Sequence, residues 1–283
     1  MNGKMQFILP MIDVLTVFPA LNKELIDLLK SLNPTDWDKK TISSNWTIRD
    51  IAIHLLDTNL KKLSIGRDGH LLSKNQQFDN YEEPVDYLNQ QNADWVKALQ
   101  RVSPAILIEM IAQCQDELLA YFNELDPYEM ALFSVRWAGK ERSENWFDIA
   151  SEYTERWLYQ QQIRFALNNQ KLLSPQFYRP FLTTALQALP YTYVNVKAPI
   201  GAVVKVEIVG DAGGSWSIIK DKNFWNFIDH EVENADALIY IDQQIAWLLF
   251  SKGINPMDAA QYYQLHGDTA LASHALKMLA VKA

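Results

Sequence analysis

Residues 45–56 read NWTIRDIAIHLL, and this stretch predicts the helix around which the first part of the chain is organised. The helix is expected to start at Thr47, because Asp50 three residues later resembles a capping box. His54 lies at the flank of the apolar stripe of this helix, where an imidazole can face a cavity inside a bundle. The stripe itself recurs at helical spacing and consists of Ile48, Ile51, Ala52 and Leu55.

Prolines and N-caps mark the starts of other helices in the first part of the chain. Pro19 and Pro84 suit a first helical turn, and Ser103-Pro104 is an N-cap followed by a proline at the first helical position. Long helices joined by short polar segments are typical of a bundle. The expected helices cover residues 19–33, 84–102, 104–125 and 146–167, and residues 126–145 are expected to form an extended loop or a short hairpin.

The pattern changes near residue 172. Residues 174–190 read as a linker with a short helix, because prolines interrupt them. Residues 203–209 and 215–220 flank a glycine-rich turn, which predicts a hairpin; a phosphate-binding loop would need a helix to follow. Residues 237–241 read as a buried strand. We therefore predict an α+β protein with two domains, a helical bundle over residues 1–172 and an α+β domain over residues 173–283.

Helix signals also occur near the end of the chain. Asp242 can cap the helix that follows the buried strand, and Asn255-Pro256 can open another. Asp268 is expected to cap a last helix that runs to residue 280. The second domain is thus expected to alternate strands and helices.

Composition narrows the class of protein. A net charge of −8 with scattered lysines and arginines argues against nucleic acid as a partner. The apolar run at residues 1–11 is interrupted by Pro10, and nowhere do eighteen apolar residues follow one another, so neither export nor membrane spanning is expected. Cys114 is the single cysteine, which agrees with the reducing cytoplasm and fits a buried position on a helical stripe. The composition leaves the oligomeric state open.

The helix over residues 146–167 carries polar groups on one face. Glu152, Glu155, Tyr159 and Gln162 follow the 3, 4, 3 spacing of a single helical face. One interpretation is a solvated face on which Glu152 and Arg156 form an ion pair. The other is a face that lines a cavity, because bundle proteins build ion sites from carboxylate and imidazole groups on facing helices.

Several stretches together resemble a known family. The stretches LNPTDWD, NWTIRDIAIHLL and EYTERWLYQQQIRFAL resemble the metal-binding domain of the mycothiol-dependent maleylpyruvate isomerase family, a branch of the DinB-like four-helix bundles. Residues 235–280, which begin ADALIYIDQQIAWLLF, are similar to the C-terminal domain of that family, which has a sterol-carrier-like α+β fold. The resemblance spans nearly the whole chain.

The resemblance implies a metal triad of histidine, glutamate and a second histidine four residues after the glutamate. These positions fall on His54, Glu155 and Tyr159, so the third ligand is a phenol. A phenol, with an ordinary pKa of about 10, must lose its proton to bind an ion well. The implied site for zinc, nickel or cobalt is therefore degenerate, and Glu152 and Gln162 are possible substitute ligands.

In the family the metal is thought to activate a low-molecular-weight thiol, which adds as a thiolate to an unsaturated acid or another electrophile. The corresponding hypothesis here is a thiol-dependent isomerase or S-transferase, with Arg136 or Arg164 as a carboxylate clamp. Two alternatives remain open. One is a non-catalytic small-molecule-binding or scaffold protein whose pocket is lined by aromatic residues, among them Trp46, Trp137, Trp157 and Tyr159. The other is a metal-independent enzyme that uses His54 and Glu155 as acid and base.

Overall fold

The computed structural model describes residues 11–43, 46–70, 82–133 and 135–281. The chain forms two units, each with its own internal contacts. The helical unit comprises Leu15–Asp126 and Tyr159–Asn169, and the mixed unit comprises Met1–Val14, Pro127–Leu158 and Gln170–Ala283. Helices and a mixed sheet together confirm the α+β class. The domain boundary near residue 172 stays a prediction, and the apolar run over residues 1–10 lies outside the described residues.

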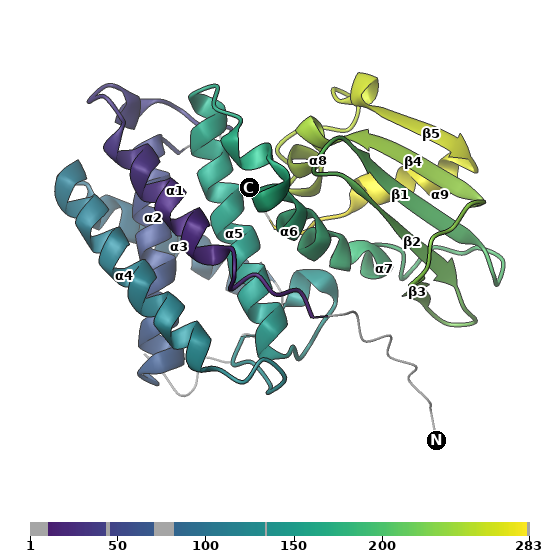
Figure 1. Ribbon diagram of the computed structural model, residues 1–283, viewed down its shortest axis with the longest axis horizontal. Coiled ribbons are helices and arrows are strands. Elements are labelled where there is room, and N and C mark those ends of the chain that lie inside the picture. The colour runs from purple at the N-terminus through teal and green to yellow at the C-terminus, as the bar shows by residue number, and fades with distance from the viewer. Residues whose placement is uncertain (1–10, 44–45, 71–81, 134, 282–283) are drawn as a thin grey trace. The chain divides into compact units, whose positions relative to one another are not determined.

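The helical unit is a bundle, as the sequence predicts. Helix α2 packs against α3 and α4, and α1 packs against α4 (Figure 1). The C-terminal part of α5 completes the core, where Ile163 is fully buried in the same cluster as Ile51 and Leu55. The helices are α1 (Phe18–Lys30), α2 (Ile48–Lys62), α3 (Glu82–Leu99), α4 (Pro104–Glu124) and α5 (Asn145–Ala166).

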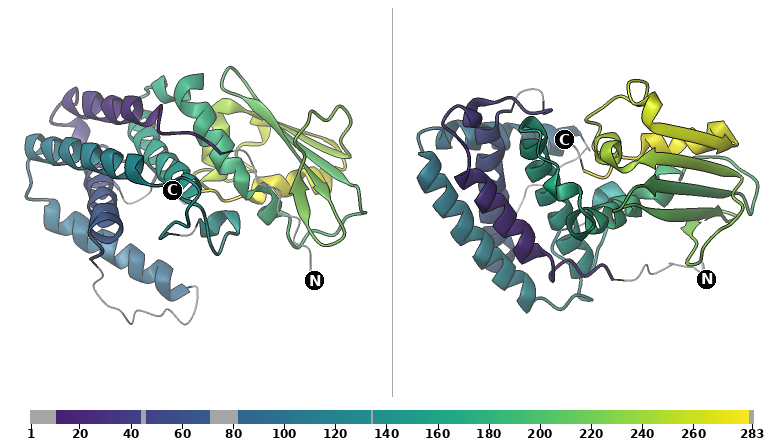
Figure 2. Two further views of the ribbon diagram at one scale, coloured as in Figure 1. Left: turned by 60° about the horizontal axis from the view of Figure 1, so that its bottom comes forward. Right: turned by 45° about the horizontal axis from the view of Figure 1, so that its top comes forward.

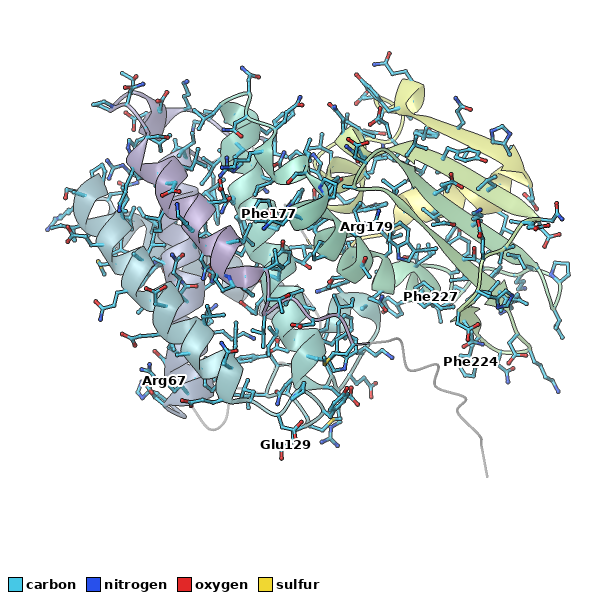
Figure 3. All side chains as sticks on the ribbon, viewed as in Figure 1. Arg67, Glu129, Phe177, Arg179, Phe224 and Phe227 are labelled. Carbon is cyan, nitrogen blue, oxygen red and sulfur yellow. The ribbon has the colours of Figure 1, made fainter. Side chains whose placement is uncertain are left out.

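The start of α2 is set by the predicted capping box. The Thr47 hydroxyl accepts a hydrogen bond from the Asp50 backbone N–H at 3.2 Å, and the Asp50 carboxylate accepts one from the Thr47 N–H at 2.9 Å. At its other end α2 continues into a single π-helical turn, Leu63–Arg67. Arg67 there bonds Glu117 of α4 at 2.9 Å, and Figure 3 shows Arg67 at one end of the bundle. Both ends of α2 are thus fixed by polar contacts.

The mixed unit is built on a five-stranded sheet of order β3-β2-β1-β4-β5 (Figure 2). Only the β1–β4 pair is parallel, and the other pairs are antiparallel. The predicted hairpin and the predicted buried strand are both confirmed, as β1–β2 and as the inner strand β4. The strands are β1 (Val203–Val209), β2 (Gly214–Lys220), β3 (Trp225–Phe227), β4 (Ala237–Asp242) and β5 (Tyr263–Gly267).

One face of the sheet is buried. Val204 and Val206 of β1 and Ile239 of β4 are completely inaccessible, whereas the alternate residues are partly exposed. This alternation is typical of a sheet covered on one side. Helices contact it at β1 and β4: α8 (Gln243–Phe250), which Asp242 caps as predicted, and α9 (Thr269–Ser273). At the β3 edge Phe227 is buried and Phe224 is exposed (Figure 3).

Three predictions of local structure need correction. Residues 174–190 were predicted to be a linker with one short helix, but the helical part is larger and comprises α6 (Pro175–Ala185) and the start of α7 (Leu189–Thr192). Tyr178 of α6 stacks on Trp157 with ring centroids 4.8 Å apart. The helix expected at Asn255-Pro256 is a turn. The last helix ends at Ser273 and continues only as the 3₁₀ turn His274–Lys277.

The segment over residues 126–145 is close to its prediction. Its described residues contain one isolated antiparallel bridge, between Met130 and Glu144, and the 3₁₀ turn Arg136–Ala138. No helix within the described ranges has both the length and the apolar character needed to cross a membrane.

Candidate functional site

Three aromatic side chains of the helical unit meet at the predicted site. The rings of His54 on α2 and Tyr159 on α5 contact each other edge to face, with centroids 4.5 Å apart. Trp46 lies 4.9 Å from the His54 ring and 6.0 Å from the Tyr159 ring. We call Trp46, His54 and Tyr159 the imidazole cluster. The prediction that the helices of His54 and Tyr159 meet is therefore confirmed for these two side chains.

The loop before α2 positions Trp46. Its carbonyl oxygen accepts hydrogen bonds from the backbone N–H and the hydroxyl of Thr41, each at 3.0 Å. A short antiparallel bridge between Lys40 and Thr47 holds the same loop. Because Trp46 directly precedes the N-cap, these contacts fix the indole beside a histidine two turns further along the helix. His54 is 4% exposed as a result.

The other predicted ligand lies one helical turn before Tyr159. Glu155 belongs to the part of α5 that is assigned to the mixed unit, together with Glu152 and Arg156. Both glutamates are partly buried, whereas Arg156 is only 3% exposed. Burial lowers the pKa of the Arg156 guanidinium to about 10, and the negative charges of Glu152 and Glu155 act in the opposite direction. Arg156 therefore remains positively charged at neutral pH.

Gln162 is the last residue on the predicted polar face. Its side chain is completely buried, and within the described part of the chain neither amide atom has a hydrogen-bond partner. Its neighbour Gln160 is equally buried but satisfied: it donates to the Leu21 carbonyl at 3.0 Å and accepts from Arg164 at 3.2 Å. This face is therefore not the solvated surface that one interpretation of the sequence proposed.

The two predicted arginine clamps have different environments. Arg164 is 2% exposed and donates to Glu24, Gln160 and Asn169, with the Glu24 carboxylate at 3.0 Å. Burial lowers the pKa of the Arg164 guanidinium, and Glu24 opposes that shift. Its donors are engaged inside the helical unit. Arg136 lies exposed on the 3₁₀ turn of the mixed unit, so it is the better suited of the two to bind a ligand carboxylate.

The aromatic residues predicted to line one pocket belong to different clusters. Trp157 is fully buried in the mixed unit, where it packs against Tyr178, Phe181 and Trp247. Trp137 packs against Phe147, and its indole N–H donates to the Ser151 hydroxyl at 3.2 Å. Trp46 and Tyr159 alone share a cluster in the helical unit.

Asp57 is a neighbour of His54 that was not predicted from the sequence. Asp57 lies one turn after His54 on α2 and is half-buried, and this burial raises the pKa of its carboxyl group. The charges of Lys61 and His54 lower that pKa in turn, so the carboxylate lies within electrostatic reach of the imidazole. The i, i+3 spacing of the two residues was the available signal.

A divalent metal ion fits these residues poorly. The described ranges contain no group of three or more histidine, cysteine, aspartate or glutamate side chains arranged to hold one. Catalytic zinc sites usually have three protein ligands, whereas the third residue here is a phenol packed against the imidazole that would have to share the ion. Glu155, moreover, already interacts with a buried guanidinium.

The chain is similar to known proteins in sequence and in fold. Residues 18–163, more than half of the chain, match the family model of the mycothiol maleylpyruvate isomerase N-terminal domain. A crystal structure of a histidine-to-alanine mutant of the mycothiol-dependent maleylpyruvate isomerase has a similar fold, with a TM-score of 0.50 at 9% identity over 91% of this chain and 93% of that chain. A second structure, of the mycothiol-dependent maleylpyruvate isomerase, has a TM-score of 0.48 at 8% identity with the same coverage. Among curated proteins, none matches the sequence.

Proposed function

This chain belongs to the family of the mycothiol maleylpyruvate isomerase N-terminal domain, and from that premise we propose that it is a thiol-dependent isomerase or S-transferase. Its substrate would be a small unsaturated acid or another electrophile. The observation that carries the proposal is the position of the imidazole cluster: its three residues, Trp46, His54 and Tyr159, all lie within the matched residues 18–163. His54, the only histidine in the sequence of α2 and α5, is also the residue that the family resemblance assigns to the site.

The chemistry proposed is a reversible thiol addition. A thiolate sulfur adds to one carbon of a conjugated C=C bond, which becomes a single bond as its electron pair moves toward the carbonyl oxygen. Rotation about that bond and loss of the same thiolate give the isomer, and the thiol is regenerated. An S-transferase would stop at the thioether, with a proton taken up at the neighbouring carbon.

Residues of the cluster suit the proton transfers of this scheme. A neutral imidazole can accept the thiol proton near pH 7, and we assign that role to His54. The Tyr159 hydroxyl would donate a hydrogen bond to the thiolate or to the developing oxyanion. Trp46 would exclude water from one side of the imidazole. Arg136 is the proposed partner of the substrate carboxylate.

We propose that the metal position is degenerate. His54 and Glu155 are retained there, and Tyr159 stands in place of a second histidine. An ion bound at such a site would lower the pKa of a coordinated thiol by stabilising its thiolate. We further propose that the mixed unit has a sterol-carrier-like fold. We also propose that the protein acts in the cytoplasm, because the thiol must stay reduced there.

The test is an assay of the full-length chain with maleylpyruvate and mycothiol, beside a panel of other unsaturated acids and low-molecular-weight thiols. We expect consumption of at least one electrophile that requires a thiol. A protein that binds these compounds, measured by calorimetry, but never consumes them would be the non-catalytic binding protein instead.

A further inference from the structure

Strand β5 is an open edge of the sheet in the mixed unit. It is the last strand in the order β3-β2-β1-β4-β5, so its strand neighbour is β4 (Figure 1). The two strands pair in an antiparallel register, with Gln264 opposite Tyr240 and His266 opposite Leu238. The side chains of Gln264 and His266 are exposed. The outer side of β5 has no strand partner among the residues that the structure describes.

The register determines which backbone groups of β5 point outward. The Asp268 N–H donates to the Asp236 carbonyl at 2.8 Å, so these two residues form a hydrogen-bonded pair. Because such pairs alternate with non-bonded pairs in an antiparallel ladder, Gln264 and His266 direct their backbone groups toward β4. The N–H and C=O groups of Leu265 therefore point away from the sheet. Within the described ranges, neither group forms a hydrogen bond to another backbone group.

The two edges of the sheet differ in how they are protected. Natural edge strands are commonly kept short or flanked by charged residues, which hinders pairing with other chains. Strand β3 follows this rule, because it has only three residues and the exposed Asp221 and Lys222 precede it. Strand β5 does not, because its five residues include no lysine, arginine, aspartate, glutamate or proline. The edge at β5 is therefore the one suited to pairing with another strand.

We propose that β5 pairs with β5 of a second copy of this chain, in antiparallel orientation about a two-fold axis. Such an edge is complementary to itself, because the axis brings each outward N–H opposite a C=O of the other copy. With the axis at Leu265, the exposed Gln264 of each copy lies opposite His266 of the other, where an amide and an imidazole can hydrogen-bond. Each copy carries a net charge of −8, and the uncharged edge lets them meet without placing like charges opposite each other.

Exposed apolar residues directly before β5 extend this surface. Tyr262 is 41% exposed and Met257 is 83% exposed, and both belong to the segment that leads into the strand. Stable specific interfaces bury about 1,200–2,000 Å² in total, which is more than two short strands supply on their own. A two-fold axis uses each of these side chains twice. Because the contact remains small, we expect dimerisation in the micromolar range of concentration.

Sedimentation of the untagged full-length chain between about 1 and 200 µM tests the proposal. The average mass should rise with concentration from that of one chain toward that of two. Gln264→Glu/His266→Glu places carboxylates opposite carboxylates and should weaken the association at least about tenfold. The matched control Ser215→Glu/Asn234→Glu adds the same charge at exposed positions of the mixed unit and should leave it unchanged. A wild-type chain that stays monomeric over the whole range would overturn the proposal, as would unchanged association of the first variant.

A mixture of two variants separates a lost contact from a damaged fold. Gln264→Lys/His266→Lys should also be monomeric alone, because ammonium groups then face each other. Mixed in equal amounts with Gln264→Glu/His266→Glu, it should form a heterodimer, since opposite charges meet across the same edge. Failure of the mixture to associate, with both variants folded by circular dichroism, would contradict the pairing of β5 with β5. These measurements use no substrate, so their outcome is independent of the proposed thiol chemistry.

Discussion

Tyr159 is the residue at which the candidate site departs from the metal triad that the resemblance implies. Its ring lies against the His54 ring at 4.5 Å, so the phenol fills space beside the imidazole. A histidine at this position could bind an ion as a neutral ligand, whereas a tyrosine must first lose a proton at a pKa that is ordinarily about 10. In our proposal, a single side chain thus puts an aromatic contact where the resemblance implies a second histidine ligand.

Gln160 and Gln162 are predicted to respond oppositely to the same substitution. Gln162→Met should raise the free energy of unfolding by about 1–2 kcal/mol, because it removes a buried amide that has no hydrogen-bond partner among the described residues. Gln160→Met should lower it by about 1–3 kcal/mol, because Arg164 and the Leu21 carbonyl lose a partner. Urea denaturation measures both. Destabilisation by both variants to the same extent would show that Gln162 is satisfied.

Asp57 gives a pH-dependent prediction. Burial raises the pKa of its carboxyl group above the ordinary value, so folding favours the protonated form. The stability that the protonated Asp57 carboxyl group contributes is fully present below the unfolded-state pKa of about 4. It is lost as the pH rises through the folded-state pKa. Asp57→Asn should therefore stabilise the protein at pH 7, by less than about 1 kcal/mol because the group is only half-buried.

The measurement is urea denaturation of wild type and Asp57→Asn between pH 3.5 and 7. The stabilisation should shrink as the pH falls toward about 4. Asp116→Asn, at an exposed position on α4, is the control. A stabilisation that instead grows toward low pH would mean that the carboxylate is held in its charged form.

At the scale of elements, the capping box fixes where α2 begins. Thr47→Ala should cost about 1–2 kcal/mol of stability, because the Asp50 N–H loses its acceptor and the reciprocal contact is weakened. Ser103→Ala at the start of α4 is the matched comparison. Its bond to the Ile106 N–H is longer, at 3.4 Å, and exposed, so the cost should be smaller. A larger loss from the Ser103 variant in thermal unfolding would contradict this order.

Elements with strong local signals could be predicted from the sequence. The start of α2 followed from its cap and apolar period, and β4 followed from a short two-sided apolar run. Only a short helix within a linker could be predicted for residues 174–190, because their prolines resemble a linker, and the full extent of α6 and α7 could not. Tyr178 and Phe181 of α6 pack on Trp157 of the preceding helix α5, and this contact between helices supports the helical form of the segment. Long-range packing of this kind leaves no local signature.

In the candidate site, too, features with a local sequence signal could be predicted and features that depend on packing between elements could not. The contact between His54 and Tyr159 was predicted, because each residue lies on a recognisable helical face. The burial of Arg156 was not, since an arginine four residues after a glutamate ordinarily forms a surface ion pair. Its depth depends on the whole fold around α5, which no spacing along the helix reveals.

At the scale of the whole molecule, two structural units share one helix. Residues 145–166 form α5, whose first part belongs to the mixed unit and whose last part belongs to the helical unit. Glu155 belongs to the first part of this helix and Tyr159 to the last part. The fold similarity over 91% of the chain extends beyond the residues that match the family model.

The central claim is that thiol-dependent chemistry takes place at His54. It is tested most directly by the thiol-dependent rate of electrophile consumption for wild type, His54→Ala and His230→Ala, in which His230 is a surface histidine of the mixed unit with a 76% exposed side chain. We expect His54→Ala to lower kcat by a factor of about 100 or more, and His230→Ala to leave it unchanged. An undiminished thiol-dependent rate in His54→Ala would contradict the account.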